Sequence, residues 1–261
     1  AGAFQRLDHD WIHKWMPQDG SVIYENLTNS MGVLVLAGPK SRNILSNITR
    51  TDLSNEKFPW LSSKKINVGL ASCIAMRVNF VGELGWELHH PIEYQNHIFD
   101  QLMESGKDHG LKPFGIRAME SLRIEKTYKL VGTEMSIEYA AFESGLDRFV
   151  HLNKGNFIGR DSLVKWQQKG FKNKMVTLEV HDIEDADALG NNPIYSNGEV
   201  IGRATGGNYG FRVKKSLAIA MVDPKFSNIG QKLEMDILDK KHNVTVIEDS
   251  PYDPLNDKLK Q

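Results

Sequence analysis

Apolar and polar positions divide the chain into a first half of alternating helices and strands and a second half of short strands. Residues 30–36 form a compact apolar run of strand length. Gly38-Pro39 follows, where a proline suits the first turn of a helix. The residues that this helix would bury are Ile44, Leu45 and Ile48.

A second β region is expected over residues 66–80, and residues 82–85 then turn the chain into a short strand over residues 86–90. Alternation along that last strand points Trp86 and Leu88 to one side and Glu87 to the other. The next two residues of the strand are His89 and His90. They face opposite sides and are poorly placed to share a metal ion, so we expect surface or capping roles for them.

Two amphipathic helices complete the first half. The first ends at Gly106, and the apolar residues at helical spacing along it are Ile98, Phe99, Leu102 and Met103. The second follows Pro113, and its candidates for burial are Met119, Leu122 and Tyr128. Arg117 and Glu120 lie three residues apart on it, a spacing typical of a solvated surface pair.

The second half has the pattern of a small antiparallel barrel or sandwich from about residue 172 to the end. Its strand candidates are residues 175–180, 194–195, 199–204, 216–222, 232–238 and 244–247. Asn197-Gly198 indicates a two-residue hairpin, because both turn residues accept positive φ. The glycine-rich segment 202–210 is open to two interpretations, hairpin turns and a phosphate-binding nest, and we favour the turns because no helix follows it.

Composition and charge exclude several classes of partner. The 261 residues are 40% hydrophobic and carry a formal net charge of -1, which offers no field to collect nucleic acid or an anionic membrane. A single cysteine, Cys73, excludes an internal disulfide and a multi-cysteine zinc site. No apolar run approaches the ~20 residues of a membrane span. We therefore expect a cytoplasmic or organelle-matrix protein whose partners are small molecules bound in pockets.

Glu87 is the strongest candidate for chemistry. A carboxylate between two large apolar neighbours must face water or be paired, since burying an unpaired charge is costly. It is either an exposed strand glutamate or an acceptor of two parallel hydrogen bonds from a planar donor, which is an arginine or a ligand heterocycle. No Walker loop, zinc-protease motif, nucleophile elbow or dinucleotide fingerprint accompanies it.

Segments along the whole chain, in order and spacing, resemble one family. They are GVLVLAGPKSRNIL at 32–45, TRTDLSNEKFPWL at 49–61, GELGWELHHP at 82–91, FGIRAMESLRIEKTYKLVGTEM at 114–135, ESGLDRFVHLNKGNFIGRDSL at 143–163 and YSNGEVIGRATGGNYGFRVKKSLAIAMV at 195–222. Together they are similar to the aminomethyltransferase-like folate domain at the C-terminal end of dimethylglycine and sarcosine dehydrogenases, within the glycine-cleavage T-protein family. GELGWEL favours these dehydrogenases over the free-standing T-protein.

The resemblance implies an α+β fold, a partial aminomethyltransferase folate-binding fold followed by a small antiparallel β-barrel. The expected domains are residues 1–168 and 172–261. The resemblance begins inside the family's folate-binding domain. We therefore expect this chain to lack the first part of that domain, with the aspartate that serves as general base or electrostatic partner, and we name no catalytic residue.

The resemblance also assigns folate-binding roles. Glu87 would accept hydrogen bonds from the exocyclic amine and a ring N–H of the pterin. Tyr128 lies where the family often places an aromatic near the folate, although a core aromatic fits its position equally well. Phe80 stands where the family commonly has a tyrosine, so it keeps the ring and loses the hydroxyl. The family arginine that contacts the folate tail aligns with Met119, which leaves Arg117 nearby on another helix face.

The activity that the resemblance implies is capture of a one-carbon unit on tetrahydrofolate, as 5,10-methylenetetrahydrofolate, after oxidation of dimethylglycine or sarcosine on FAD. FAD is expected only in an upstream flavin domain, which nothing in this chain resembles. The location is the cytoplasm, or the mitochondrial matrix of a eukaryote. Two alternatives remain: a glycine-cleavage aminomethyltransferase acting on a lipoyl carrier, and a non-catalytic folate-binding or docking module.

Overall fold

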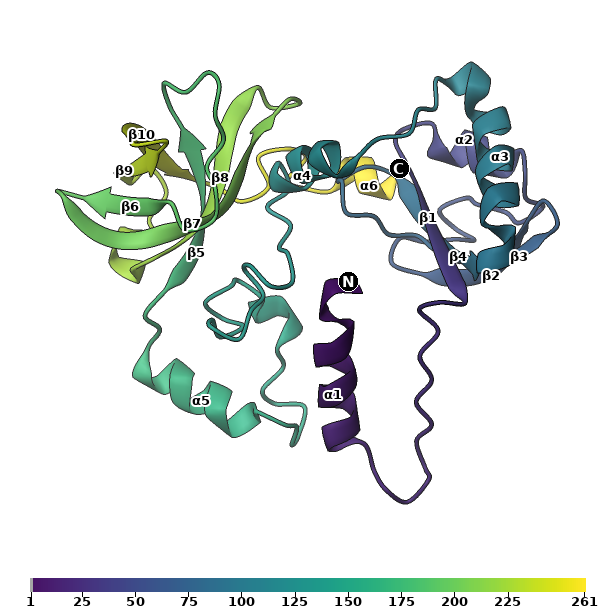
Figure 1. The fold of residues 1–261 in the computed structure, drawn as a ribbon, viewed down its shortest axis with the longest axis horizontal. Coiled ribbons are helices and arrows are strands. Elements are labelled where there is room, and N and C mark those ends of the chain that lie inside the picture. The colour runs from purple at the N-terminus through teal and green to yellow at the C-terminus, as the bar shows by residue number, and fades with distance from the viewer. Residues whose placement is uncertain (1) are drawn as a thin grey trace. The chain divides into compact units, whose positions relative to one another are not determined.

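The computed structural model of the chain describes residues 2–261 (Figure 1). It has two compact units. The first contains the chain up to Asn79, then Glu83–Pro113 and Asp257–Gln261, and the second contains Phe80–Gly82 and Phe114–Asn256. The predicted domains, residues 1–168 and 172–261, refer to family domains and stay a prediction.

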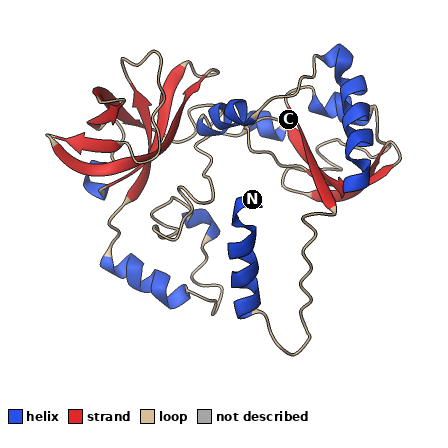
Figure 2. Cartoon of the chain, viewed as in Figure 1, coloured by secondary structure: helices blue, strands red, loops and turns tan. Residues whose placement is uncertain are grey.

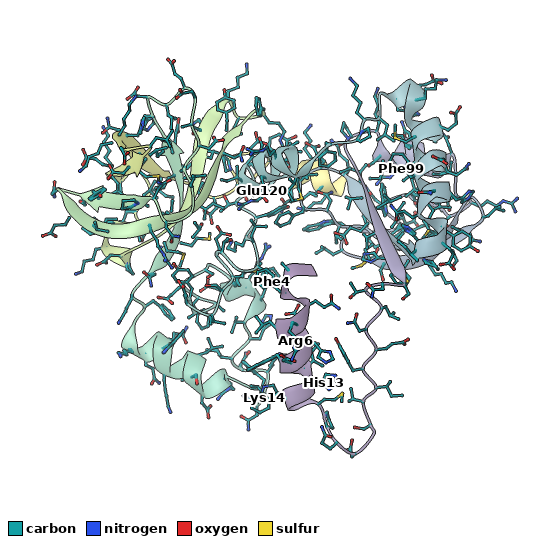
Figure 3. The ribbon with its side chains drawn as sticks, viewed as in Figure 1. Phe4, Arg6, His13, Lys14, Phe99 and Glu120 are labelled. Carbon is teal, nitrogen blue, oxygen red and sulfur yellow. The ribbon has the colours of Figure 1, made fainter. Side chains whose placement is uncertain are left out.

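The first unit is built on a four-stranded antiparallel sheet with the strand order β1-β4-β3-β2. The strands are β1 (Met31–Ala37), β2 (Ser63–Val68), β3 (Ala71–Met76) and β4 (Gly85–Pro91), and the helices are α1 (Gln5–Trp15), α2 (Ser41–Ser46), α3 (Gln95–Gly106) and α6 (Asp257–Lys260). One face of the sheet forms a hydrophobic core with α2 and α3. The predicted strand at 30–36 and both predicted helices of this unit are confirmed. Ile44, Leu45, Ile98 and Leu102 are buried as expected, whereas Phe99 on α3 is 40% exposed (Figure 3).

Strand β4 determines which side chains enter this core. Trp86 and Leu88 are fully buried, whereas the side chains of Glu87 and His89 are 30% and 29% exposed. The predicted alternation is thus confirmed. Of the surface or capping roles expected for His90, the surface role is wrong, because His90 shares the face of Trp86 and Leu88 and is buried, with Nδ1 2.8 Å from the Leu88 carbonyl oxygen.

The last residues of the chain return to the first unit and meet two arginines there. Arg77, 1% exposed, donates hydrogen bonds to the main-chain oxygens of Phe58 at 2.7 Å and Gln261 at 2.6 Å. Arg42 donates to the same Gln261 oxygen at 2.5 Å. Both guanidinium groups lie over the ring of Trp86, at 5.9 and 5.8 Å from its centroid. The segment 257–261 is therefore part of this unit's structure, which the sequence pattern did not indicate.

Helix α1 was not predicted either. It has no buried residue, and an exposed Arg6–Asp10 ion pair spans one of its turns. Figure 3 labels Arg6, His13 and Lys14 along it. Within residues 2–261, no helix is long and apolar enough to cross a membrane.

The second unit contains a closed barrel of antiparallel strands in the order β10-β5-β8-β7-β6-β9, drawn in red in Figure 2. Its strands are β5 (Lys174–Val180), β6 (Pro193–Ser196), β7 (Glu199–Gly210), β8 (Lys215–Val222), β9 (Lys232–Ile237) and β10 (Lys240–Ile247), and its helices are α4 (Ile116–Ile124) and α5 (Arg160–Lys169). The predicted barrel and the α+β class are confirmed. Asn197 and Gly198 connect β6 to β7 with φ values of 51° and 82°, as the hairpin prediction requires.

The glycine-rich segment 202–210 lies inside β7, so its interpretation as hairpin turns is wrong. Its glycines allow close approach to neighbouring chain. A Cβ atom at Gly207 would lie 2.8 Å from the Cβ of Ala188 and 2.9 Å from the Leu217 carbonyl oxygen. The pairing register with β8 shifts between Ala204 and Gly206, where the strand bulges. A turn-like composition here marks tight packing of a long strand.

Substitution of Gly207 tests this packing. Gly207→Ala should lower the free energy of unfolding by about 1–3 kcal/mol, because the added methyl group overlaps atoms that have little room to move. Gly206→Ala is the matched control in the same strand, since the nearest atom to its Cβ would be 3.7 Å away. Denaturant unfolding of both variants measures the difference, and equal stabilities would contradict the packing argument.

The buried thiol of Cys73 on β3 gives a prediction about pH. Burial raises the pKa of this thiol from 9.0 to about 11. The unfolded thiol ionises first as the pH rises, so Cys73 contributes stability that is present below pH ~9 and lost towards pH ~11. The difference in unfolding free energy between wild type and Cys73→Ala should therefore narrow across that range. A constant difference would contradict the prediction.

Candidate functional site

Glu87 lies at the centre of the open face of the sheet. In register it is flanked by Val35 of β1 and Met76 of β3. Its Oε2 lies 3.1 Å from Nε2 of His89, two residues along the same strand. Within residues 2–261, this is the one hydrogen bond of the carboxylate, so Oε1 remains available as an acceptor.

The surroundings of this pair are apolar. His89 is flanked in register by Val33 and Ile74, which are 46% and 50% exposed, and Val35 beside Glu87 is also 46% exposed. A Glu–His pair framed by exposed β-branched side chains can present a carboxylate to a flat ligand and cover the ligand's faces with apolar groups. This arrangement suits a heterocycle with adjacent N–H donors.

Phe80 and Tyr128 are brought together in the second unit. Their rings stack with centroids 5.7 Å apart and planes 27° apart. Phe80 follows the end of β3, and α4 ends at Ile124, so neither residue lies in the element predicted for it. Burial raises the pKa of the Tyr128 hydroxyl, which therefore stays protonated and can donate a hydrogen bond.

A buried polar network holds the segment that carries Tyr128. Glu134 is fully buried, and its carboxylate accepts hydrogen bonds from the Leu130 N–H at 2.8 Å and from the Thr205 hydroxyl of β7. Arg123 donates to the Tyr128 carbonyl oxygen at 3.0 Å, and its Nη1 lies 3.9 Å from Glu134. Sequence reasoning missed the role of Glu134, because a glutamate next to Gly132-Thr133 has the composition of an exposed turn.

Arg117 projects from the exposed part of α4. The expected surface pair with Glu120 is wrong, because Glu120 (Figure 3) accepts a hydrogen bond from Arg123 at 2.8 Å instead. Within residues 2–261, the Arg117 side chain forms no hydrogen bond or ion pair. Its guanidinium group is therefore available to an anionic ligand. Phe80, Tyr128 and Arg117 belong to the second unit, whereas Glu87 belongs to the first.

An open cavity of about 390 Å³ lies beside the barrel, and its polar side chains include Tyr139, Asn191 and Arg203. Arg203 donates hydrogen bonds to the other two, and none of the predicted site residues lines this cavity. In the described part of the chain, no group of three or more His, Cys, Asp or Glu side chains is placed to hold a metal ion.

Comparison with known proteins gives matches over most of the chain. The family model of the GCVT N-terminal domain matches residues 1–154, and that of the glycine cleavage T-protein C-terminal barrel domain matches residues 173–253. The mitochondrial dimethylglycine dehydrogenase of Homo sapiens is 38% identical over 245 residues, 92% of this chain and 28% of that protein. An aminomethyltransferase of Thermoanaerobacter pseudethanolicus is 34% identical over 246 residues, 92% of this chain and 65% of the relative. The chain therefore spans less than two thirds of the length of either relative.

The fold is shared with a solved structure. The crystal structure of aminomethyltransferase T of the glycine cleavage system from Bartonella henselae matches with a TM-score of 0.76 at 21% identity, over 86% of this chain and 60% of that one. At this identity the likeness shows the fold alone. The N-terminal family model covers more than half of the chain and the barrel model most of the remainder, so this chain belongs to the glycine cleavage T-protein family.

Proposed function

We propose that this chain is the tetrahydrofolate-binding part of an FAD-linked dimethylglycine or sarcosine dehydrogenase, which captures the one-carbon unit as 5,10-methylenetetrahydrofolate. Membership of the T-protein family and the 38% identity to a dimethylglycine dehydrogenase support it. The observation that carries the proposal is Glu87, a carboxylate on an apolar sheet face with one oxygen unused by the described protein.

The proposed role of Glu87 is to bind and orient the pterin. A carboxylate accepts two parallel hydrogen bonds from an exocyclic amine and an adjacent ring N–H, and the charge on the acceptor strengthens both. Val33, Val35 and Ile74 would pack against the ring system. Proton transfer is not assigned to Glu87, and we assign no catalytic residue within the chain.

The other three predicted residues have supporting roles in the proposal. For Phe80 and Tyr128 we keep the folate-binding role that the family resemblance implies: within their own unit they form an aromatic pair, and the Tyr128 hydroxyl is a neutral donor. Arg117 is an exposed cation suited to the carboxylates of the folate tail. Tetrahydrofolate, when bound, supplies the nitrogen atoms that take up the one-carbon unit.

In this proposal the amine is oxidised on a flavin held by an upstream domain of the same protein. Holding folate close to that flavin raises the effective concentration of the reactive one-carbon species and limits its escape to water. The dimethylglycine dehydrogenase of Homo sapiens is named as mitochondrial, so we propose the mitochondrial matrix for a eukaryotic source and the cytoplasm otherwise.

A second candidate is a glycine-cleavage aminomethyltransferase, supported by the 34% identity to an aminomethyltransferase over 246 residues. Turnover with a reduced aminomethyl-lipoyl carrier protein would support it. A folate-binding module without activity is a third candidate. Binding of a reduced folate without turnover of either substrate would support that one.

Substitution of Glu87 tests the pterin assignment. Glu87→Gln replaces one acceptor oxygen with an N–H donor and removes the charge, so affinity for 5-formyltetrahydrofolate should fall about tenfold to a hundredfold. Calorimetric titration measures it. The melting temperature should stay unchanged, since the side chain is on the open face.

Glu93→Gln is the control, because Glu93 is an exposed glutamate of the same unit. Equal folate affinity of Glu87→Gln and wild type would refute the role of Glu87. No binding by wild type would refute the proposal that this chain holds tetrahydrofolate.

A further inference from the structure

The Glu87–His89 pair points to a residue role that the sequence did not indicate. We propose that His89 is a positioning residue that holds the Glu87 carboxylate in the orientation needed to accept hydrogen bonds from the pterin. This inference rests on the proposed function, because it deepens the description of the same site. The observation that motivates it is the 3.1 Å separation of His89 Nε2 and Glu87 Oε2.

The backbone of β4 holds Glu87 and His89 next to each other in fixed positions. Residues two apart on a strand lie on the same face, so Glu87 and His89 are neighbours along one strand. β4 is hydrogen-bonded to β1 on one side and β3 on the other, which fixes both Cα positions. The two side chains are the flexible part of the pair, and their mutual hydrogen bond restricts both.

No other polar partner competes for the carboxylate in the adjoining strands. The cross-strand row of Glu87 contains Val35, Met76 and, at the edge, Ser63. The cross-strand row of His89 contains Val33, Ile74 and Lys65. Of these three, Lys65 has the charged side chain; it lies two strands away on β2 and is separated from His89 by Ile74. At about 4.8 Å per strand, Lys65 is roughly 10 Å from His89 in the sheet. His89 is thus the residue placed to fix the carboxylate.

The hydrogen bond leaves the carboxylate able to bind a ligand. An ionised carboxylate has about four acceptor positions on its two oxygens. With Nε2–H donating to Oε2, His89 uses one of them, so Oε1 and the second lone pair of Oε2 remain for two parallel donors. A glutamate without this tether would rotate freely on an exposed face, and binding would cost the entropy of ordering it. The tether removes part of that cost before the ligand arrives.

A double-mutant cycle tests the proposal on the full chain. The proteins are wild type, His89→Ala, His89→Gln, Glu87→Ala and the Glu87→Ala/His89→Ala double variant, titrated with 5-formyltetrahydrofolate in a calorimeter. His89→Ala should weaken binding about threefold to tenfold, which is the effect expected when one hydrogen bond to the carboxylate is lost. His89→Gln should recover most of the affinity, because its amide N–H can donate to the same oxygen. In the Glu87→Ala background, removal of His89 should have no further effect.

The control is His151→Ala, an exposed histidine whose side chain forms no hydrogen bond, ion pair or ring contact with another described residue, and its affinity should equal that of wild type. Unchanged affinity in His89→Ala, or an equal loss with and without Glu87, would overturn the positioning role while leaving the proposed function intact. Absence of folate binding by wild type, or normal binding by Glu87→Ala, would instead overturn the proposed function and this inference with it.

Discussion

The alternation of side chains along β4 is the constraint on which both the core of the first unit and the candidate site depend. Trp86, Leu88 and His90 enter the core, and Glu87 and His89 are left on the open face. A slip of one residue in the register would bury a carboxylate and expose an indole, at a cost of several kcal/mol. Because β4 is bonded on both edges, this slip would also break two ladders. The packing of Trp86 therefore fixes where Glu87 points.

Each unit buries a charged side chain that forms hydrogen bonds with other chain segments, and these hydrogen bonds restrict the segments that they join. In the first unit, Arg77 donates hydrogen bonds to two main-chain oxygens, and its desolvation and the nearby Arg42 both lower its pKa. A guanidinium group with five donors can join chain segments that are distant in sequence, here residues 58 and 261. In the second unit, the carboxylate of Glu134 accepts from neighbouring donors. Such networks are costly to leave half-satisfied, so each one fixes the segments that it joins.

The local parts of the fold could be predicted from the sequence, and the long-range parts could not. The strands of the barrel and the Asn197-Gly198 turn follow from short-range alternation and turn chemistry. The glycines of β7 were misread because a glycine-rich segment is usually a turn, and the contact of Gly207 with Ala188 is visible only after folding. His90 was expected in a surface or capping role, although the alternation that buries Trp86 also buries His90. In that case the pattern was the better guide than the polarity of the side chain.

In the candidate site, too, the local features could be predicted from the sequence and the contacts between side chains could not. Alternation alone indicated that Glu87 faces away from the core, but the hydrogen bond from His89 depends on rotamers that no sequence pattern specifies. The stack of Phe80 on Tyr128 joins two loops, which propensity does not place. With phenylalanine at position 80, the pair keeps one hydroxyl, and burial keeps that hydroxyl protonated. Among the predicted binding residues, Glu87 is therefore the one whose carboxylate can accept hydrogen bonds from adjacent N–H groups of a heterocycle. It follows that the ligand specificity of this sheet face depends on how firmly that one carboxylate is held.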